Sequence, residues 1–329
     1  MKLTTNCVAL AALLTFATST AHAVDFNFVD VLNVGNSPDP LTGSVFGSVD
    51  HAYSIATTEV TNAQYTEFLN AIADSDPNDV WNTTMTTEIS RSGTDGSYTY
   101  AVEPGFGSQP VRIVSFFDAA RFVNWLENGQ PTGPQGAGTT ETGTYTIGDG
   151  TNETRADDAT FLLPSEDEWY KAAYHQPAAL GGDADSYWLY PTQENSQPTV
   201  ENPAGGDNSA NFGGSLGDTT NVGAFTGTTS FYGGFDFGGN AFEWTEGLSG
   251  DGTQRVIRGG TWNGDVQLLA ATSRTIVDPI GGSPFPSGFG FRIAAILNYT
   301  PEPGTAVLAL TGTLLLMMFS GRQFQNRTR

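Results

Sequence analysis

The sequence predicts an α+β fold with few helices, short strands and long loops. Three observations lead to this class. Three segments carry a helix start signal, and an apolar stripe follows it in two of them. Short apolar runs are bounded by turn residues, and long Gly-, Thr- and Asn-rich stretches separate these runs. No internal repeat or Pro-rich linker divides the body of the 329-residue chain, so one large domain is the economical interpretation.

Each predicted helix begins with a capping box, in which a Ser or Thr caps the helix and a polar residue three positions later reaches back. The three boxes are Thr61–Gln64, Ser115–Asp118 and Ser165–Glu168. Apolar residues behind the first two boxes recur at the spacing of one buried helix face. Gly129 stands where a C-terminal capping glycine is expected after the second helix.

The remaining chain predicts strands and loops. The strand candidates are Phe26–Leu32, Ala52–Ile55, Ala101–Val102, Val256–Ile257 and Phe289–Ile296. The long loops are Gly129–Asp158, Gly181–Asp185 and Glu201–Thr228. Loops of this length are typical of segments that fold around ions or form a binding surface.

Residues 1–23 are typical of a secretory signal peptide. Lys2 supplies the positive start, Val8–Ala17 is apolar, and Ala21-His22-Ala23 gives the small-x-small pattern that signal peptidase accepts. The apolar run has about ten residues against the ~20 that a spanning helix needs, which argues against the alternative of a retained anchor. We therefore expect the mature chain, and its domain at residues 24–299, to begin at Val24.

The C-terminal residues 300–329 have a sorting pattern of their own. Pro301, Glu302 and Pro303 precede an apolar segment at about residues 305–320, and three arginines follow. This order resembles a PEP-CTERM sorting signal. The resemblance implies a Gram-negative bacterium whose exosortase cleaves near the motif and passes the protein to the cell surface or extracellular matrix. The alternative is an ordinary membrane anchor, and both place the body beyond the inner membrane.

Cysteine and charge limit the function classes. The one cysteine, Cys7, lies in the predicted signal peptide, so the mature chain has neither a disulfide nor a reactive thiol. The formal net charge of −22 repels nucleic acid, which excludes a nucleic-acid partner, and it favours cation binding.

Six ordered motifs carry a family resemblance between Val29 and Ile296. They are the segments Glu59–Asn70, Pro110–Leu126, Leu163–Tyr174, Phe235–Trp244, Arg258–Trp262 and Gly288–Arg292. Together they resemble the sulfatase-modifying-factor family, the formylglycine-generating-enzyme domain, whose fold is related to C-type lectins. The tryptophans within these motifs, Trp125, Trp169 and Trp244, are expected in the core, and Arg258 and Arg292 are expected in buried ion pairs.

The resemblance implies metal chemistry that this chain supports only in part. Copper-dependent members carry two cysteines soon after the Arg-Gly-Gly motif, whereas here Asn263–Arg274 holds Gly264, Leu268 and Leu269 and no sulfur. Copper(I) needs a thiolate, so formylglycine formation by the known chemistry is not expected. Another branch of the family holds iron with three histidines. Here only His51 and His175 remain, and we expect both to be unpaired surface residues, with an iron site shared with a carboxylate as the alternative.

The resemblance also implies calcium bound by loop oxygens. The matching residues are Asn211, Phe212, Asp218, Gly239, Asn240, Ala241 and Glu243. An acidic, loop-rich exported domain offers the six to eight hard oxygens that calcium prefers. The alternative is that Asn240 and Glu243 only make hydrogen bonds within their own turn.

These observations predict an exported, surface-sorted binding or scaffold protein, stabilised by calcium and without formylglycine-generating activity. The expected partners are signal peptidase and exosortase during export, and a peptide, glycan or matrix polymer afterwards. The segments Gly181–Ser230 and Asp265–Ser287 are the expected ligand surface. The alternative function is a non-heme metal-dependent oxidoreductase with iron on His51 and His175.

Overall fold

The computed structural model describes residues 23–280 and 288–297. Its α-helices are α1 (Asn62–Ile72), α2 (Phe116–Glu127) and α3 (Glu166–Tyr174). Its strands are β1 (Phe28–Val31), β2 (Tyr53–Ala56), β3 (Ile89–Ser92), β4 (Thr99–Val102), β5 (Phe161–Leu162), β6 (Phe242–Leu248), β7 (Arg255–Arg258), β8 (Thr275–Val277), β9 (Phe289–Gly290) and β10 (Ala294–Ile296). These short elements confirm the α+β class with few helices and long loops.

All three helices begin where the capping boxes predict. In the first box, the Thr61 hydroxyl accepts the Gln64 N–H, and the Gln64 side chain accepts the Thr61 N–H at 2.9 Å. The same reciprocal pair forms at Ser115–Asp118 and at Ser165–Glu168. Each box satisfies backbone N–H groups that the first helical turn leaves without a partner, which is why this short signal locates the helices.

Three sheets organise the strands. One has the order β1-β2-β10-β5, one is the β3–β4 hairpin, and one has the order β8-β7-β6-β9. The β6–β9 pair is parallel, and the others are antiparallel. Phe289–Ile296 is therefore not one strand, as the sequence predicted. It divides into β9 and β10, which belong to different sheets, so this segment joins the two four-stranded sheets.

Four strands were not predicted: β3, β5, β6 and β8. The most important is β6, which lies in the middle of its sheet although it carries Glu243, Glu246 and Gly247. Charged residues and glycine are unfavourable in strands, so propensity points away from a central strand here. The reason that β6 forms is tertiary, because Glu243 has a buried cationic partner that the sequence pattern does not show.

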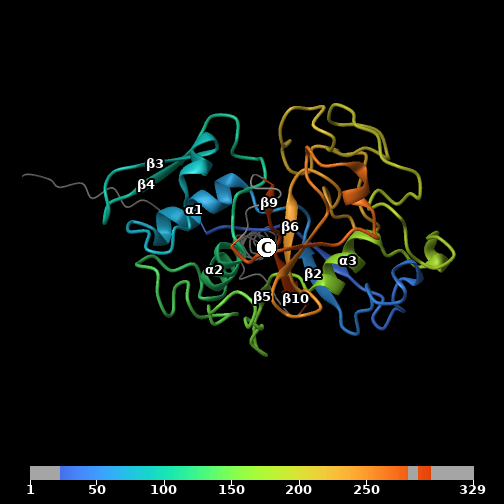
Figure 1. The fold of residues 1–329 in the computed structure, drawn as a ribbon, viewed down its shortest axis with the longest axis horizontal. Coiled ribbons are helices and arrows are strands. Elements are labelled where there is room, and N and C mark those ends of the chain that lie inside the picture. Colours follow the sequence, from blue (N-terminus) through green and yellow to red (C-terminus); the bar gives the residue numbers. More distant parts are fainter. Residues whose placement is uncertain (1–22, 281–287, 298–329) are drawn as a thin grey trace, which may run out of the picture.

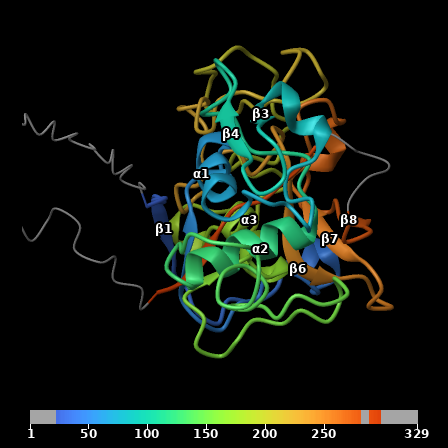
Figure 2. The ribbon, with the colours of Figure 1, turned by 90° about the vertical axis from the view of Figure 1, so that its left-hand side faces the viewer.

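The helices pack on different parts of the strand assembly. Figure 1 shows α1 and the β3–β4 hairpin on one side of β6, β2 and β10, and α3 on the other side. In the quarter-turn view of Figure 2, α1 and α2 lie toward the viewer. Helices α1 and α2 share one core cluster with Trp125 and Trp244, and α3 shares another with Trp169. The three tryptophans are at most 2 % exposed, which confirms their prediction as core residues.

The long loop Gly129–Asp158 packs against α2, where the Asn124 side chain donates to the Thr140 and Tyr145 carbonyls. Gly129–Asp158 and Glu201–Thr228, both fully described, contain no helix or strand, as predicted. No helix among the described residues is long and apolar enough to cross a membrane. The predicted signal peptide, apart from Ala23, and the sorting motif Pro301, Glu302 and Pro303 with its apolar segment lie outside the described residues.

Candidate functional site

An arginine on the segment between β9 and β10 ties the core to the loops. Arg292 is fully buried, and its Nε and Nη2 donate to the two carboxylate oxygens of Glu243 on β6 at 2.5 and 2.6 Å. The same guanidinium donates to the carbonyl oxygens of Ala56 on β2 and of Phe235 in the loop before β6. The predicted buried ion pair of Arg292 is confirmed, and so is that of Arg258, which pairs with Glu166.

Three carboxyl groups surround this one cation. Burial, reinforced by the charge of Asp236, raises the pKa of Glu59 well above its usual range. Burial likewise raises the pKa of Asp236 to about 6, against the stabilising backbone hydrogen bond from Gly223. Burial disfavours the charged form of Arg292, but the adjacent Glu243 outweighs this and raises the pKa of the arginine. Three carboxyl groups therefore share one buried cation, and burial favours the protonated form of Glu59.

Two amide side chains lie on the loop side of this centre. Asn240 has a left-handed backbone with φ of 58°, and its side-chain N–H donates to Glu59 Oε1 at 3.1 Å. The Asn211 side-chain N–H donates to the Asp218 carbonyl at 2.9 Å and lies 3.5 Å from Asn240 Oδ1. The backbones also meet, because the Asn240 N–H donates to the Asn211 carbonyl at 2.9 Å. The amides therefore join two loops that are almost thirty residues apart.

The close approach of these loops requires glycine at position 239. Gly239 has φ of +86°, and a Cβ atom there would lie 2.1 Å from the Asn211 carbonyl oxygen. No L-residue fits at that distance, and the left-handed backbone disfavours a side chain independently.

Four buried polar side-chain atoms among the described residues lack a hydrogen-bond partner, and they belong to neighbouring residues. They are Glu59 Oε2, Arg112 Nε, Asn211 Oδ1 and Trp262 Nε1. Glu59 contacts Asn240, which contacts Asn211, and the Trp262 backbone N–H donates to the Asn240 carbonyl. The Arg112 guanidinium lies 6.0 Å from the Trp262 ring centroid. Buried polar groups without partners are uncommon, so their gathering here marks these loops as a candidate binding site.

The structure brings most of the predicted calcium ligands together. Asn211, Asp218, Gly239 and Asn240 are joined by direct contacts, with Phe212 and Ala241 next to them in the chain. Asn211 Oδ1 is a buried carbonyl oxygen without a donor, which fits a hard cation.

Two of the predicted ligands are engaged elsewhere. Glu243 is directed to Arg292 and to the Trp169 indole N–H, so both of its oxygens have partners. Asp218 Oδ1 pairs with Arg112 at 2.7 Å. The amide pair thus fits calcium better than the carboxylates do, and the ion itself stays a prediction.

The two histidines have partners, contrary to the prediction of unpaired surface residues. His175 is only 4 % exposed, and its Nδ1 lies 2.7 Å from the Tyr232 hydroxyl. Burial and the nearby Lys171 lower its pKa to about 4. The half-exposed His51 bonds Glu168 through Nε2 at 2.8 Å. Among the residues that the structure describes, no group of three or more His, Cys, Asp or Glu side chains could hold a metal ion.

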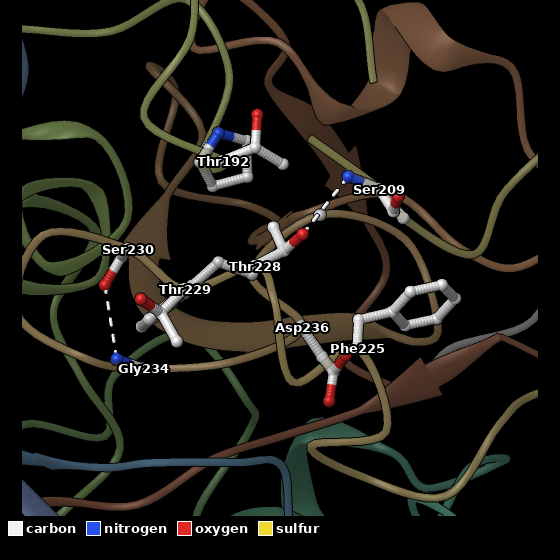
Figure 3. Close-up of a pocket in the computed structure, with 12 residues that line it drawn as sticks. Thr192, Ser209, Phe225, Thr228, Thr229, Ser230, Gly234 and Asp236 are labelled. Carbon is white, nitrogen blue, oxygen red and sulfur yellow. Dashed lines mark hydrogen bonds between the residues drawn. The ribbon is translucent and has the colours of Figure 1, made fainter. Parts of the chain in front are cut away.

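A small pocket opens in the predicted ligand region. Figure 3 shows Thr192, Ser209, Thr228 and Ser230 around it, with Asp236 at one side. Thr228 accepts the Ser209 N–H at 3.1 Å, and Ser230 accepts the Gly234 N–H at 3.3 Å. Its interior of about 20 Å³ has room for roughly one water molecule. The sequence identified the segment Gly181–Ser230 but not Asp236, which lies beyond it.

The family of this domain follows from comparison with known proteins. The chain belongs to the FGE-sulfatase family, the sulfatase-modifying factor enzyme 1-like domain, whose family profile matches residues 47–296. This confirms the resemblance seen in the motifs.

One solved structure supports the fold, and two others show weaker similarity. The chain is similar to Treponema denticola variable protein 1, with 21% identity, a TM-score of 0.50, and coverage of 84% of this chain and 97% of that one. It is also similar to CarF, with 21% identity, a TM-score of 0.49 and coverage of 83% and 99%, respectively. PvdO from Pseudomonas aeruginosa has 19% identity, a TM-score of 0.45 and coverage of 83% and 92%. No curated protein sequence matches the chain.

Proposed function

We propose that this chain is a binding scaffold of its family that does not generate formylglycine, stabilised by calcium, exported and sorted to the cell surface. The observation that carries this proposal is the packing of the segment after Arg258-Gly259-Gly260. Copper-dependent members are expected to place two cysteines in this segment.

Apolar side chains occupy that segment in this chain. Leu269 is fully buried in a small cluster with Tyr190, Ala210 and Ala270. A Cβ atom at Gly264 would lie 2.8 Å from Leu268 Cδ1, so the turn is closed around glycine. The described part of this segment supplies neither a thiolate nor an imidazole, the donors that copper or iron would need.

Calcium would act here as a structural ion. Asn211 Oδ1 and backbone carbonyls of the loops at Phe212, Gly239 and Ala241 are the groups that would hold it, together with the Asp218 oxygen that Arg112 does not contact. Calcium supplies charge neutralisation and fixes loop oxygens when it is bound. Because the same loops border the pocket in Figure 3, the ion would stiffen the expected ligand surface.

The surface charge limits the ligand. Every arginine in the described residues pairs with a carboxylate. The unpaired charge on the described surface is therefore mainly acidic. A neutral or cationic peptide, glycan or matrix polymer suits such a surface, whereas a polyanion does not.

The activity part of the proposal is tested with a sulfatase-derived cysteine peptide, copper and oxygen. Mass spectrometry of the peptide should show the thiol unchanged, while an active copper-dependent enzyme run in parallel converts it to the aldehyde. Conversion by this chain above the peptide-only blank would refute the proposal, because it would require an oxidation site other than a cysteine pair.

The export part is tested by the intact mass of the protein recovered from the surface of cells that express the whole chain. Signal-peptidase cleavage should give a chain that begins at Val24, and exosortase cleavage should place its end near Pro301–Pro303. Recovery of the uncleaved chain from the cytoplasm would contradict the proposal.

A further inference from the structure

A second, larger cavity lies away from the calcium candidate, at the start of α2. It has a volume of about 460 Å³, in the range of ligand-binding pockets. Its apolar wall consists of Ile113, Val114, Phe117, Ile280 and Phe289. Its polar lining consists of Asn78, Asp79, Asn82, Thr84, Ser115, Asp118 and Arg121. No motif of the sequence analysis marked this cavity as a site.

The charge at this cavity is negative despite the presence of an arginine. Arg121 donates to both carboxylate oxygens of Glu141, at 2.7 and 3.0 Å. Glu141 does not line the cavity, and it neutralises the positive charge of Arg121. Asp118 and Asp79 also line the cavity, and neither makes an ion pair within the described part of the chain. Asp118 is 6 % exposed, and its Oδ2 accepts the Ser115 N–H at 2.8 Å. A buried carboxylate beside apolar walls favours a cationic guest.

The pKa of Asp118 shows that burial disfavours the charged form of this carboxylate. Burial raises its pKa to about 6, although the Ser115 hydrogen bonds and the charge of Arg121 on α2 lower it. Asp76, from the loop after α1, raises it further. A cation placed at Asp118 would therefore stabilise the charged carboxylate.

Hydrogen bonds hold the polar side chains that line the cavity, some to other lining residues and some to residues next to it. The Asn82 side-chain N–H donates to the Ile113 carbonyl at 3.1 Å, and Asn82 Oδ1 accepts the Thr84 N–H at 3.0 Å. Asn78 donates to Gln135 and to Glu141. Ile113 itself has φ of +67°, a conformation that is unfavourable for a β-branched residue. Such strain persists where surrounding contacts impose it, and it is common at ligand sites.

We infer that this cavity binds an alkylammonium group, such as the side chain of a lysine. The ammonium would lie at Asp118, and the methylene chain would lie along Ile113, Val114 and Phe117, as lysine stems do on apolar surfaces. The net charge of −22 would attract such a cation from solution. An alkylammonium group could come from a free amine or from a lysine within a polypeptide. The inference is independent of the calcium centre.

The test is calorimetric titration of the full-length protein with three probes. These are Nα-acetyl-lysine methylamide, its norleucine analogue without the ammonium, and pentylammonium. The lysine probe should bind at least about 10-fold more tightly than the norleucine probe, the gap expected for one partly buried charge contact. Tighter binding of the lysine probe than of pentylammonium would indicate a polypeptide source, and equal binding would indicate a free amine. Equal affinity for lysine and norleucine, or no saturation by either amine, would overturn the inference.

Three variants locate the binding. Asp118→Asn keeps an acceptor for the Ser115 N–H and should weaken the lysine probe about 10-fold. Asp79→Asn is tolerated at φ of 52°, so it gives a second readout if the first variant folds poorly, and it should weaken binding several-fold. Asp158→Asn, an exposed charge that does not line the cavity, should change nothing. Unchanged affinity in both pocket variants would refute the assignment.

Discussion

Replacement of Arg292 by methionine should be among the most destabilising single changes in the chain. Arg292 and Glu243 are both fully buried, and the arginine also supplies donors to Ala56 and Phe235. Loss of the guanidinium would leave Glu243 with only the Trp169 N–H, close to Glu59 and Asp236.

Breaking a buried ion pair from one side costs about 3–5 kcal/mol, because the remaining charge is uncompensated. For a domain of this size each kcal/mol lowers Tm by about 2–4 °C, so we expect a fall of roughly 10 °C. The assay is urea unfolding, with the free energy of unfolding extrapolated to water and the m-value compared with that of the wild type.

A double-mutant cycle separates the ion pair from the lost packing. Arg292→Met combined with Glu243→Leu should cost less than the sum of the single changes, since no buried charge then remains. Arg274→Met is the matched control. Its partner Glu166 keeps Arg258, so the cost should be below about 1 kcal/mol. A cost below about 1 kcal/mol for Arg292→Met, or strict additivity in the cycle, would refute the role assigned to this pair.

Three further outcomes are expected. The hydrogen bond that His51 donates to the Glu168 carboxylate raises the pKa of His51, so His51→Ala should lose stability below about pH 6.5 and match the wild type once the pH exceeds the folded-state pKa of His51. Urea midpoints measured against pH would show this, and an equal loss at pH 9 would contradict it. Gly239→Ala should abolish the close approach of the loops and cost several kcal/mol by circular-dichroism melting, whereas Gly217→Ala, which also has positive φ but open space around it, should cost only about 1–2 kcal/mol. Chelation should lower Tm of the wild type, and Asn211→Ala should reduce that difference; a Tm that calcium does not change in either protein would count against the calcium centre.

The sequence predicts helices better than strands in this chain. Each helix start depends on a local signal, such as Thr61 with Gln64. Both residues of this signal are close in the sequence, so the sequence pattern alone shows it. Strand β6 depends instead on a distant residue, because Glu243 is tolerated in the sheet only through Arg292, forty-nine positions away. The pattern of apolar and polar residues within β6 does not show a contact with a residue so far along the chain. The sequence therefore did not predict β6.

The same limit applies to the site. The motif around Asn240 and the partner loop at Asn211 were recognised from residue identity, and the structure brings them into contact. His175 was expected at the surface because it follows a helix in a polar stretch, yet Tyr232 and Tyr187 cover it. Contacts between such distant segments have no signature in one sequence. The cavity at Asp118 was missed for the same reason, since its lining comes from several separate segments.

The most direct test of the central claim is elemental analysis of the purified protein after mild desalting. A scaffold stabilised by calcium should carry about one or two calcium ions per chain, with copper and iron at trace level. Stoichiometric copper or iron would contradict the account and would make His51 and His175 the first residues to replace.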